Sequence, residues 1–490
     1  MAASFEYGLV NTVRITAENA AEKPLAPESG APRKTAGFPG RFLGLMRGQD
    51  EHGETRRMSL IAFFIRVVSA GIAFLAQIFL ARLMGQFEYG IFVFVWVMAI
   101  IVGNLACFGF HTALIRFVPQ YRAHGEIAKI RGITATARLF SLASASLVAV
   151  LGVAFVYSFS DAMPPYYLVP LVIGAFILPM IALGDIMDGT ARANSWIVQA
   201  LTPTYLARPF LIPVVMFIAV FLGYEADART ALIAALIATY LTTLAQLAIL
   251  GWRLRRRFEA GPKEIELGYW IRIALPIFLI EGFYYLLTNA DVVMVGMFLP
   301  PDQVATYYAA AKIMALVHFV FFAVKAGMAP RFSALVADND TDELARIAAT
   351  AAYWTFWPTI AIGGIVLVLG PFLLSLFGPD FQAGYPVMFI LFAGVAAKAL
   401  IGPGETLLTM AGRQTICAVI YLAVLIVNIA GNILLIPIFG INGAATATML
   451  AMFAETALLF AVIRNRLDIN MSVLSRPGSA AGGKASRHGL

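Results

Sequence analysis

At 490 residues, with 60% hydrophobic and only 13% charged residues, the chain is too apolar for an ordinary soluble protein, whose apolar share lies near half. The formal net charge of +7 would suit nucleic-acid binding, but the basic residues lie mainly between apolar runs, which favours membrane topology. The two cysteines, Cys107 and Cys417, lie inside apolar runs with no CxxC or Cys/His spacing, so the sequence predicts neither a disulfide framework nor a metal site.

Residues 1–58 form a polar stretch that contains four prolines and eight basic residues against seven acidic ones. The stretch has no short apolar core with a small-residue cleavage site, which a signal peptide would require. We therefore expect a disordered cytoplasmic tail here. Residues 465–490 are expected to form a second cytoplasmic tail.

Apolar runs long enough to cross a hydrocarbon core of about 30 Å recur between these two tails. The predicted transmembrane helices lie at about 59–81, 90–115, 136–157, 166–187, 204–223, 229–252, 271–299, 304–328, 348–377, 384–402, 414–437 and 441–464. The predicted fold class is therefore an all-α polytopic membrane protein with about twelve spans.

The basic residues divide unevenly between the two sides of these spans. The even-numbered connections and their flanks hold eighteen Lys and Arg residues, whereas the opposite side holds only Arg82 and Arg229. Short loops rich in Lys and Arg resist translocation, so the basic side is expected to be cytoplasmic, with both chain ends on it. Glu88 lies near enough in the sequence to neutralise Arg82.

The chain is predicted to consist of two similar lobes, residues 59–252 and 271–464, joined by a basic cytoplasmic linker at 253–270. Because each lobe has an even number of spans, both enter the membrane from the same side and the repeats are parallel. The first hairpin of each lobe aligns about 215 residues apart, with Gly90 on Ala305, Phe92 on Tyr307, Arg116 on Arg331 and Phe117 on Phe332. A shorter match places Arg192 on Arg413.

In the stretches ARLMGQFEYGIF and ALIRFVPQYRAHGE, the first hairpin resembles that of the polysaccharide transporter family, the Wzx-type oligosaccharide flippases. The second hairpin and the FGINGAA turn that begins at Phe439 resemble the same family. The family belongs to the multidrug/oligosaccharidyl-lipid/polysaccharide exporter superfamily. The resemblance implies a V-shaped, two-lobed transporter in the bacterial inner membrane. It also implies a substrate: undecaprenyl-pyrophosphate-linked oligosaccharide units, moved from the inner to the outer leaflet.

Charged residues within spans are candidate functional groups, because they are costly in hydrocarbon unless paired or exposed to a wet cavity. Glu281 and His318 are predicted at equal depth on neighbouring helices, about 15 Å from the inner face, so they could pair. Asp291 and Lys312 are matched in depth in the same way. The alternative to a functional role is that the two ion pairs only stabilise the hairpin.

Further polar positions extend this set. Asn289 falls on the same helical face as Glu281, and Glu455 lies near the middle of the last span. Together with Asp291 and His318, they are candidates for the polar cavity or for coupling to protons or sodium ions. For Glu455, a structural partner is the alternative.

A pyrophosphate-linked substrate requires cations that face the cavity, and guanidinium groups can grip phosphate oxygens with two parallel hydrogen bonds. Arg66, Lys312 and Lys398 are the candidate headgroup contacts, with snorkelling or local pairing as the alternative. Arg116 and Arg331, at the inner ends of spans two and eight, are candidates for an inner gate. They would otherwise serve as positive-inside anchors at helix C-termini.

The sequence contains no Walker loop, HExxH or GxSxG motif, and no GxGxxG after a strand, so it predicts a transporter rather than an enzyme. The sequence Asp-Asn-Asp at 338–340 mimics the DxD motif of sugar-nucleotide enzymes. Glu343 follows Asp340 by three residues, however, which favours a helix cap. No cofactor is expected. Energy would come from an ion gradient or from the substrate gradient.

The favoured function is that of a flippase, acting beside glycosyltransferases and a polysaccharide polymerase. A cation-coupled multidrug exporter of the same superfamily is the alternative, since intramembrane acids also suit that role. A membrane-bound glycosyltransferase is disfavoured, because the longest predicted outer connection has only about eight residues.

Overall fold

The computed structural model describes residues 51–473, with side chains from Phe64 onward, and all of its regular elements are helical within that range. By its contacts the chain divides into two units, Met1–Ser59 and Leu60–Leu490, and apart from the start of α3 every helix among the described residues lies in the second unit. The predicted tails fall mostly outside the described residues.

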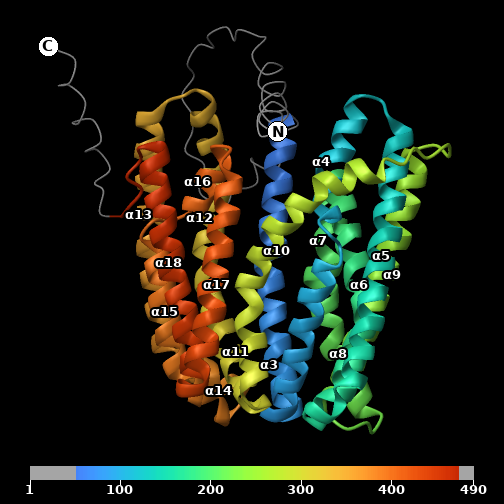
Figure 1. The fold of residues 1–490 in the computed structure, drawn as a ribbon, viewed down its shortest axis with the longest axis vertical. Helices are drawn as coiled ribbons and strands as arrows, with labels where there is room; N and C mark the ends of the chain where they lie inside the picture. Colours follow the sequence, from blue (N-terminus) through green and yellow to red (C-terminus); the bar gives the residue numbers. More distant parts are fainter. Residues whose placement is uncertain (1–50, 474–490) are drawn as a thin grey trace, which may run out of the picture. The chain divides into compact units, whose positions relative to one another are not determined.

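The helices follow one another with short connections (Figure 1). The first half comprises α3 (Glu51–Leu105), α4 (Phe110–Ala123), α5 (Ile127–Ser158), η1 (Ser160–Ala162), α6 (Pro165–Ala193), α7 (Ile197–Leu201), η2 (Thr202–Ala207), α8 (Arg208–Phe221) and α9 (Ala228–Arg257). The second half comprises α10 (Leu267–Phe298), α11 (Pro301–Ala315), η3 (Leu316–His318), α12 (Phe319–Ala337), α13 (Thr341–Val368), α14 (Gly370–Phe377), η4 (Pro379–Gly384), α15 (Tyr385–Ala399), α16 (Gly404–Met410), α17 (Gln414–Phe439) and α18 (Ile441–Leu467).

The long helix α3 is in fact two helices that meet at Gly85. The backbone there has φ 77° and ψ 173°, outside the helical region and readily adopted only by glycine. The hydroxyl of Tyr89 donates to Oε1 of Gln77 over 2.8 Å, although twelve residues of continuous helix would span about 18 Å. The chain therefore reverses direction at Gly85, as expected for the first predicted hairpin.

Counting α3 as two helices, the twelve predicted spans are confirmed. In the part of the chain that the structure describes, eleven apolar helical segments are long enough to cross a membrane, and the first of them, Phe64–Ala123, contains both arms of the hairpin. The observed helices extend past several predicted ends, because polar residues continue a helix after it leaves the apolar layer. For example, α9 continues to Arg257 and α10 begins at Leu267, so the connection between them is shorter than the predicted linker.

The predicted cap before α13 is also confirmed. The side chain of Asp340 accepts a 3.0 Å hydrogen bond from the backbone amide of Glu343, which satisfies one of the free amides at the helix start. Asp340 therefore has a structural role in this fold.

The two halves contact each other closely at the end that carries the Gly85 turn, which we call the hairpin end. A Cβ atom on Gly90 would lie 1.7 Å from the carbonyl oxygen of Pro301, so only glycine allows this approach. The guanidinium of Arg82 donates to the carbonyl oxygens of Ser375 and Leu376, at 2.5 and 2.7 Å. Both hairpins thus turn at the same end, as parallel repeats require.

At the opposite end, which we call the basic end, α10 begins against the first half. The indole of Trp270 donates to the hydroxyl of Tyr121 over 2.9 Å, and that hydroxyl donates to Glu266. Farther along, α10 contacts α17 of the second half, where the rings of Tyr284 and Tyr421 are 5.3 Å apart. Helix α10 therefore crosses from one half to the other.

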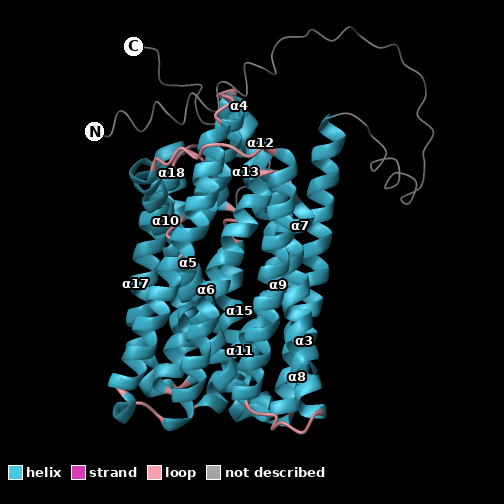
Figure 2. Cartoon of the chain, turned by 90° about the vertical axis from the view of Figure 1, so that its right-hand side faces the viewer, coloured by secondary structure: helices cyan, strands magenta, loops and turns pink. Residues whose placement is uncertain are grey.

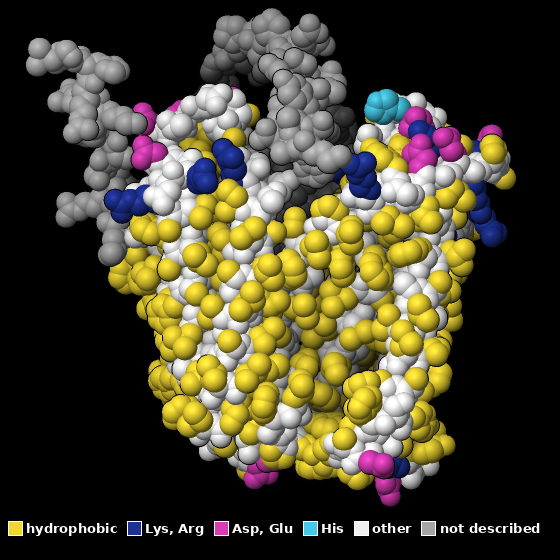
Figure 3. Space-filling view, viewed as in Figure 1, with side chains coloured by type: hydrophobic (Ala, Val, Ile, Leu, Met, Phe, Trp, Pro, Cys, Tyr) yellow, Lys and Arg dark blue, Asp and Glu magenta, His cyan; other side chains and the backbone are white. Residues whose placement is uncertain are grey.

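The surface explains why the chain belongs in a bilayer. Viewed from the side, the helices run side by side between loops gathered at the two ends (Figure 2). On the face drawn in Figure 3, apolar side chains cover the middle, while Lys and Arg gather at the end near α4 and α16. Such an apolar band matches a hydrocarbon layer, so the chain is a multi-pass membrane protein.

Substituting Gly90 by Ala is expected to lower the stability of the folded protein by about 1–3 kcal/mol, because the added methyl group collides with the Pro301 carbonyl. Thermal unfolding of the purified protein in detergent measures the change. Gly152→Ala is the matched control, since nothing lies within 4 Å of a Cβ atom there. Equal melting temperatures for the two variants would contradict the close packing of the hairpins.

Candidate functional site

The carboxylate of Glu281 on α10 reaches across to α4 of the first half. It lies 3.1 Å from Nε2 of His111 and accepts a 2.8 Å hydrogen bond from the hydroxyl of Thr112. The predicted partner His318 instead lies in η3, with its ring 5.9 Å from that of Phe321. The predicted Glu281–His318 pair is therefore wrong, because equal depth does not fix the direction in which each side chain points.

Close to Glu281, the first half contains two acids that the sequence did not predict as functional, Asp185 and Asp188. Asn104 donates to Asp185 over 3.2 Å, and one turn farther along α6 Asp188 forms a 2.8 Å ion pair with Arg192. The buried guanidinium of Arg208 packs beside Gly184, 3.3 Å from where a Cβ atom would lie, and its Nε has no hydrogen-bond partner among the described residues. These charged groups lie within membrane-spanning helices. Their position in an apolar span is the sequence signal that marks them as candidate functional residues.

Asp291 lies on α10 beyond the crossing point, inside the second half. Its carboxylate accepts a 2.7 Å hydrogen bond from the hydroxyl of Tyr307, while the ammonium of Lys312 lies 4.9 Å from the centre of the Tyr308 ring. Among the described residues no ion pair joins Asp291 to Lys312, so that predicted pair is wrong. Asn289 donates to the backbone oxygen of Tyr285, four residues earlier in the same helix.

Four charged residues form a cluster near the basic end of the second half. The ammonium of Lys398 is 2.8 Å from Glu455 and 3.9 Å from Glu405. Glu405 also pairs with Lys325 at 2.9 Å and accepts a 3.1 Å hydrogen bond from Tyr421. The cluster joins α12, α15, α16, α17 and α18 and carries no net charge. To bind a substrate headgroup, Lys398 would first have to break its contacts with the carboxylates of Glu455 and Glu405.

Arg66 lies between the two halves. Its guanidinium carbon is 5.7 Å from the centre of the Tyr205 ring in η2 and 5.9 Å from that of Phe322 in α12. The side chain is exposed, and no carboxylate lies within ion-pair distance in the part of the chain that the structure describes. A cation held between aromatic faces keeps its hydrogen-bond donors available to a ligand.

The arginines at the helix ends have different environments. Arg82 binds backbone carbonyls of the second half, and Glu88 accepts from the backbone amide of Ala228, so the predicted Arg82–Glu88 pair is wrong. Arg116 and Arg331 are both exposed, each followed by a buried phenylalanine, as the repeat predicted. Their role as an inner gate stays a prediction.

Comparison of the sequence with protein-family models identifies the family of this chain. The model of the family described as "polysaccharide biosynthesis protein" matches residues 56–336, more than half of the chain. The chain belongs to this family. A second family model, named MatE, matches residues 276–434. The resemblance to polysaccharide transporters inferred from the sequence is thereby confirmed.

Two proteins similar to this chain come from the archaeon Haloferax volcanii. A probable low-salt glycan biosynthesis flippase, Agl15, is 25% identical over 423 residues, which cover 82% of each chain. A probable flippase, AglR, is 29% identical over 172 residues, which cover 33% of this chain and 35% of AglR.

Solved structures of low sequence identity share the fold. An inward-facing multidrug resistance transporter of the MATE family superposes with a TM-score of 0.68 at 13% identity, covering 83% of this chain and 98% of its own. The lipid II flippase MurJ, in an inward closed conformation, gives 0.65 at 14% identity, covering 83% and 87%. The predicted transporter fold is confirmed.

Replacing Lys398 by Met is expected to destabilise the protein by about 3 kcal/mol, because it leaves the buried carboxylate of Glu455 without its cation. The double variant K398M/E455M should recover much of that loss, since neither charge then remains unpaired. Thermal unfolding in detergent gives the double-mutant cycle. Lys312→Met is the matched control, because the ammonium of Lys312 lies against the Tyr308 ring and forms no ion pair with a carboxylate among the described residues. Losses that simply add in the double variant would exclude the pair.

Proposed function

We propose that this chain is a flippase that moves a lipid-linked glycan across a membrane by alternating access between its two halves. The observation that carries the proposal is the similarity over 423 residues to Agl15, a probable glycan biosynthesis flippase. The geometry supports it, because the halves pack tightly at the hairpin end while Arg66 lies between them with its charge unpaired. Transport rather than catalysis is the activity we infer.

The substrate we propose is an oligosaccharide linked to undecaprenyl pyrophosphate, moved from the inner to the outer leaflet of a bacterial inner membrane. The basic end would face the cytoplasm, with both chain ends there, since basic residues gather at that end (Figure 3). Glycosyltransferases would supply the substrate and a polymerase would consume the product. Arg66 is the leading headgroup contact, with Lys312 as the second.

Coupling to protons or sodium ions is the proposed source of energy. Glu281 is the acid best placed for it, because its ion-pair partner His111 belongs to the other half. Protonation or sodium binding at Glu281 would weaken that contact and favour separation of the halves at the basic end. Asp291 and Glu455 have their partners inside the second half and are the less direct candidates.

A cation-coupled exporter of small molecules is the second candidate function. It is favoured by the fold similarity to MATE transporters and by the MatE model match at residues 276–434. Drug efflux from energised vesicles, with no movement of lipid-linked sugar, would support this candidate over the flippase.

Reconstitution of the purified protein tests the flippase directly. Vesicles containing a fluorescent undecaprenyl-pyrophosphate oligosaccharide should show protein-dependent movement of the sugar between leaflets. Arg66→Gln is expected to slow this movement roughly tenfold or more, since one lost contact to phosphate is worth about 1.5–3 kcal/mol. Arg229→Gln, at an exposed arginine of the hairpin end, is the control. Equal rates for both variants would remove Arg66 from the site.

Locking the hairpin end should stop transport if access alternates. The amide of Gln86 donates to the hydroxyl of Thr306 over 2.6 Å, so cysteines at these two positions would be close enough for a short thiol cross-linker. The background would carry Cys107→Ala and Cys417→Ala. We expect cross-linking to abolish transport and a cleavable linker to restore it on reduction. Full activity of the cross-linked protein would contradict alternating access through this end.

A further inference from the structure

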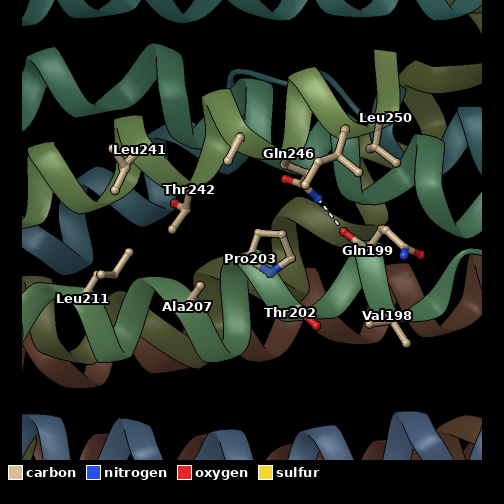
Figure 4. Close-up of a pocket in the computed structure, with 12 residues that line it drawn as sticks. Val198, Gln199, Thr202, Pro203, Ala207, Leu211, Leu241, Thr242, Gln246 and Leu250 are labelled. Atoms are coloured by element: carbon tan, nitrogen blue, oxygen red, sulfur yellow. Dashed lines mark hydrogen bonds between the residues drawn. The ribbon is translucent and has the colours of Figure 1, made fainter. Parts of the chain in front are cut away.

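A lipid-facing groove lies on the flank of the first half, between α7–η2–α8 and α9 (Figure 4). Its volume is about 360 Å³, and its walls are largely apolar. Several of its lining residues are exposed on the outer surface, among them Val198, Leu241 and Ile249. The groove therefore opens toward the bilayer rather than toward the space beside Arg66.

The groove exists because the helix opposite α9 is irregular. Pro203 has no amide hydrogen, so the carbonyl oxygen of Gln199 loses its usual helical partner four residues on. The side-chain amide of Gln246 supplies the missing donor over 2.9 Å, and the backbone widens into the π-helical turn η2 (Figure 4). The irregular backbone thus leaves a gap between η2 and α9.

Above the groove, toward the basic end, α9 presents arginines on the same face. Gln246, Leu250, Arg253 and Arg257 follow at intervals of four, three and four residues, which keeps them on one side of the helix. The guanidinium carbons of Arg253 and Arg257 lie 5.4 and 5.7 Å from the centre of the Trp196 ring. Among the described residues, no carboxylate forms an ion pair with either arginine.

This arrangement matches a phospholipid with an anionic headgroup. From Leu241 to Leu250 the groove runs about 14 Å along α9, which would hold part of one acyl chain. Arg253 and Arg257, beside an aromatic ring at the height expected for headgroups, would bind its phosphate. A lipid without net charge would fill the groove with its acyl chain, but it would bring no net negative charge to the two arginines.

We propose that this groove is a binding site for an anionic phospholipid of the surrounding bilayer. The site goes beyond the proposed transport activity and does not depend on it. Because Tyr205 in η2 also contacts Arg66, the lipid would support the helix turn that holds this candidate headgroup contact. The bilayer phospholipid is preferred over the transported lipid because the groove faces away from the interface between the halves.

Lipid binding by the purified full-length protein tests the proposal, with native mass spectrometry during titration by dioleoyl phosphatidylglycerol or dioleoyl phosphatidylcholine. We expect one phosphatidylglycerol to bind at least tenfold more tightly than phosphatidylcholine. The variant R253Q/R257Q should lose roughly thirtyfold in affinity for phosphatidylglycerol, at about one kcal/mol for each arginine near the surface. Arg255→Gln, at an exposed position between them, is the matched control.

The apolar part of the site is tested separately. Ala245→Phe fills the groove and should weaken binding of both lipids, whereas Leu244→Phe, on the neighbouring exposed surface, should leave binding unchanged. Unchanged melting temperatures would show that each variant is folded. Equal affinity for the two lipids, or unchanged binding to A245F, would overturn the proposal. Displacement of phosphatidylglycerol by an equimolar polyprenyl pyrophosphate would also overturn it, by assigning the groove to the transported lipid.

Discussion

The cost of an unpaired charge in hydrocarbon governs how these helices are arranged. The carboxylates of Glu281, Asp185 and Glu455 lie deep in the described helices, and each has a hydrogen-bond or ion-pair partner on another helix. Such partners are directional, unlike apolar contacts, so they fix the rotation of a helix about its own axis. Apolar packing then fills the remaining space around these fixed points.

Some of these ion-pair partners lie in the same half as the carboxylate, and others lie in the opposite half. Only contacts of the first kind can persist when the halves move relative to one another. The cluster around Lys398 lies wholly within the second half and could move with it as a unit. Glu281 and His111 belong to different halves, although α10 carries Glu281 near its crossing point. A motion that separates the halves at the basic end must therefore break this pair or bend α10 between Glu281 and Tyr284, where it meets α17.

The sequence predicted the spans and the repeat well because both depend on properties that vary along one dimension. Hydropathy locates a helix, and counting basic residues orients it. Ion pairs depend on the rotation of each helix about its axis and on which helices become neighbours. The depth of a residue in the membrane determines neither of these. For this reason the predicted partners of Glu281, Asp291 and Arg82 were wrong, while the correspondence of Arg116 with Arg331 agrees with their common exposed setting. Asp185 lies inside the predicted span 166–187 but was not among the candidate residues, whereas Arg208 was counted only with the basic residues that flank the spans.

The two copies of the hairpin now differ in a way that bears on mechanism. His111 precedes Arg116 by five residues, and Lys325 precedes Arg331 by six, so each half places an ionisable group at a similar level of its second span. Lys325 pairs with Glu405 in its own half, whereas His111 pairs with Glu281 on the helix that crosses between halves. Ionisable groups at similar levels of the two hairpins thus have different roles: one contact lies within a half, and the other joins the halves. If coupling acts through protonation, as proposed, a proton at the second kind of contact would change how the halves are held together, whereas at the first kind it would change contacts within one half only.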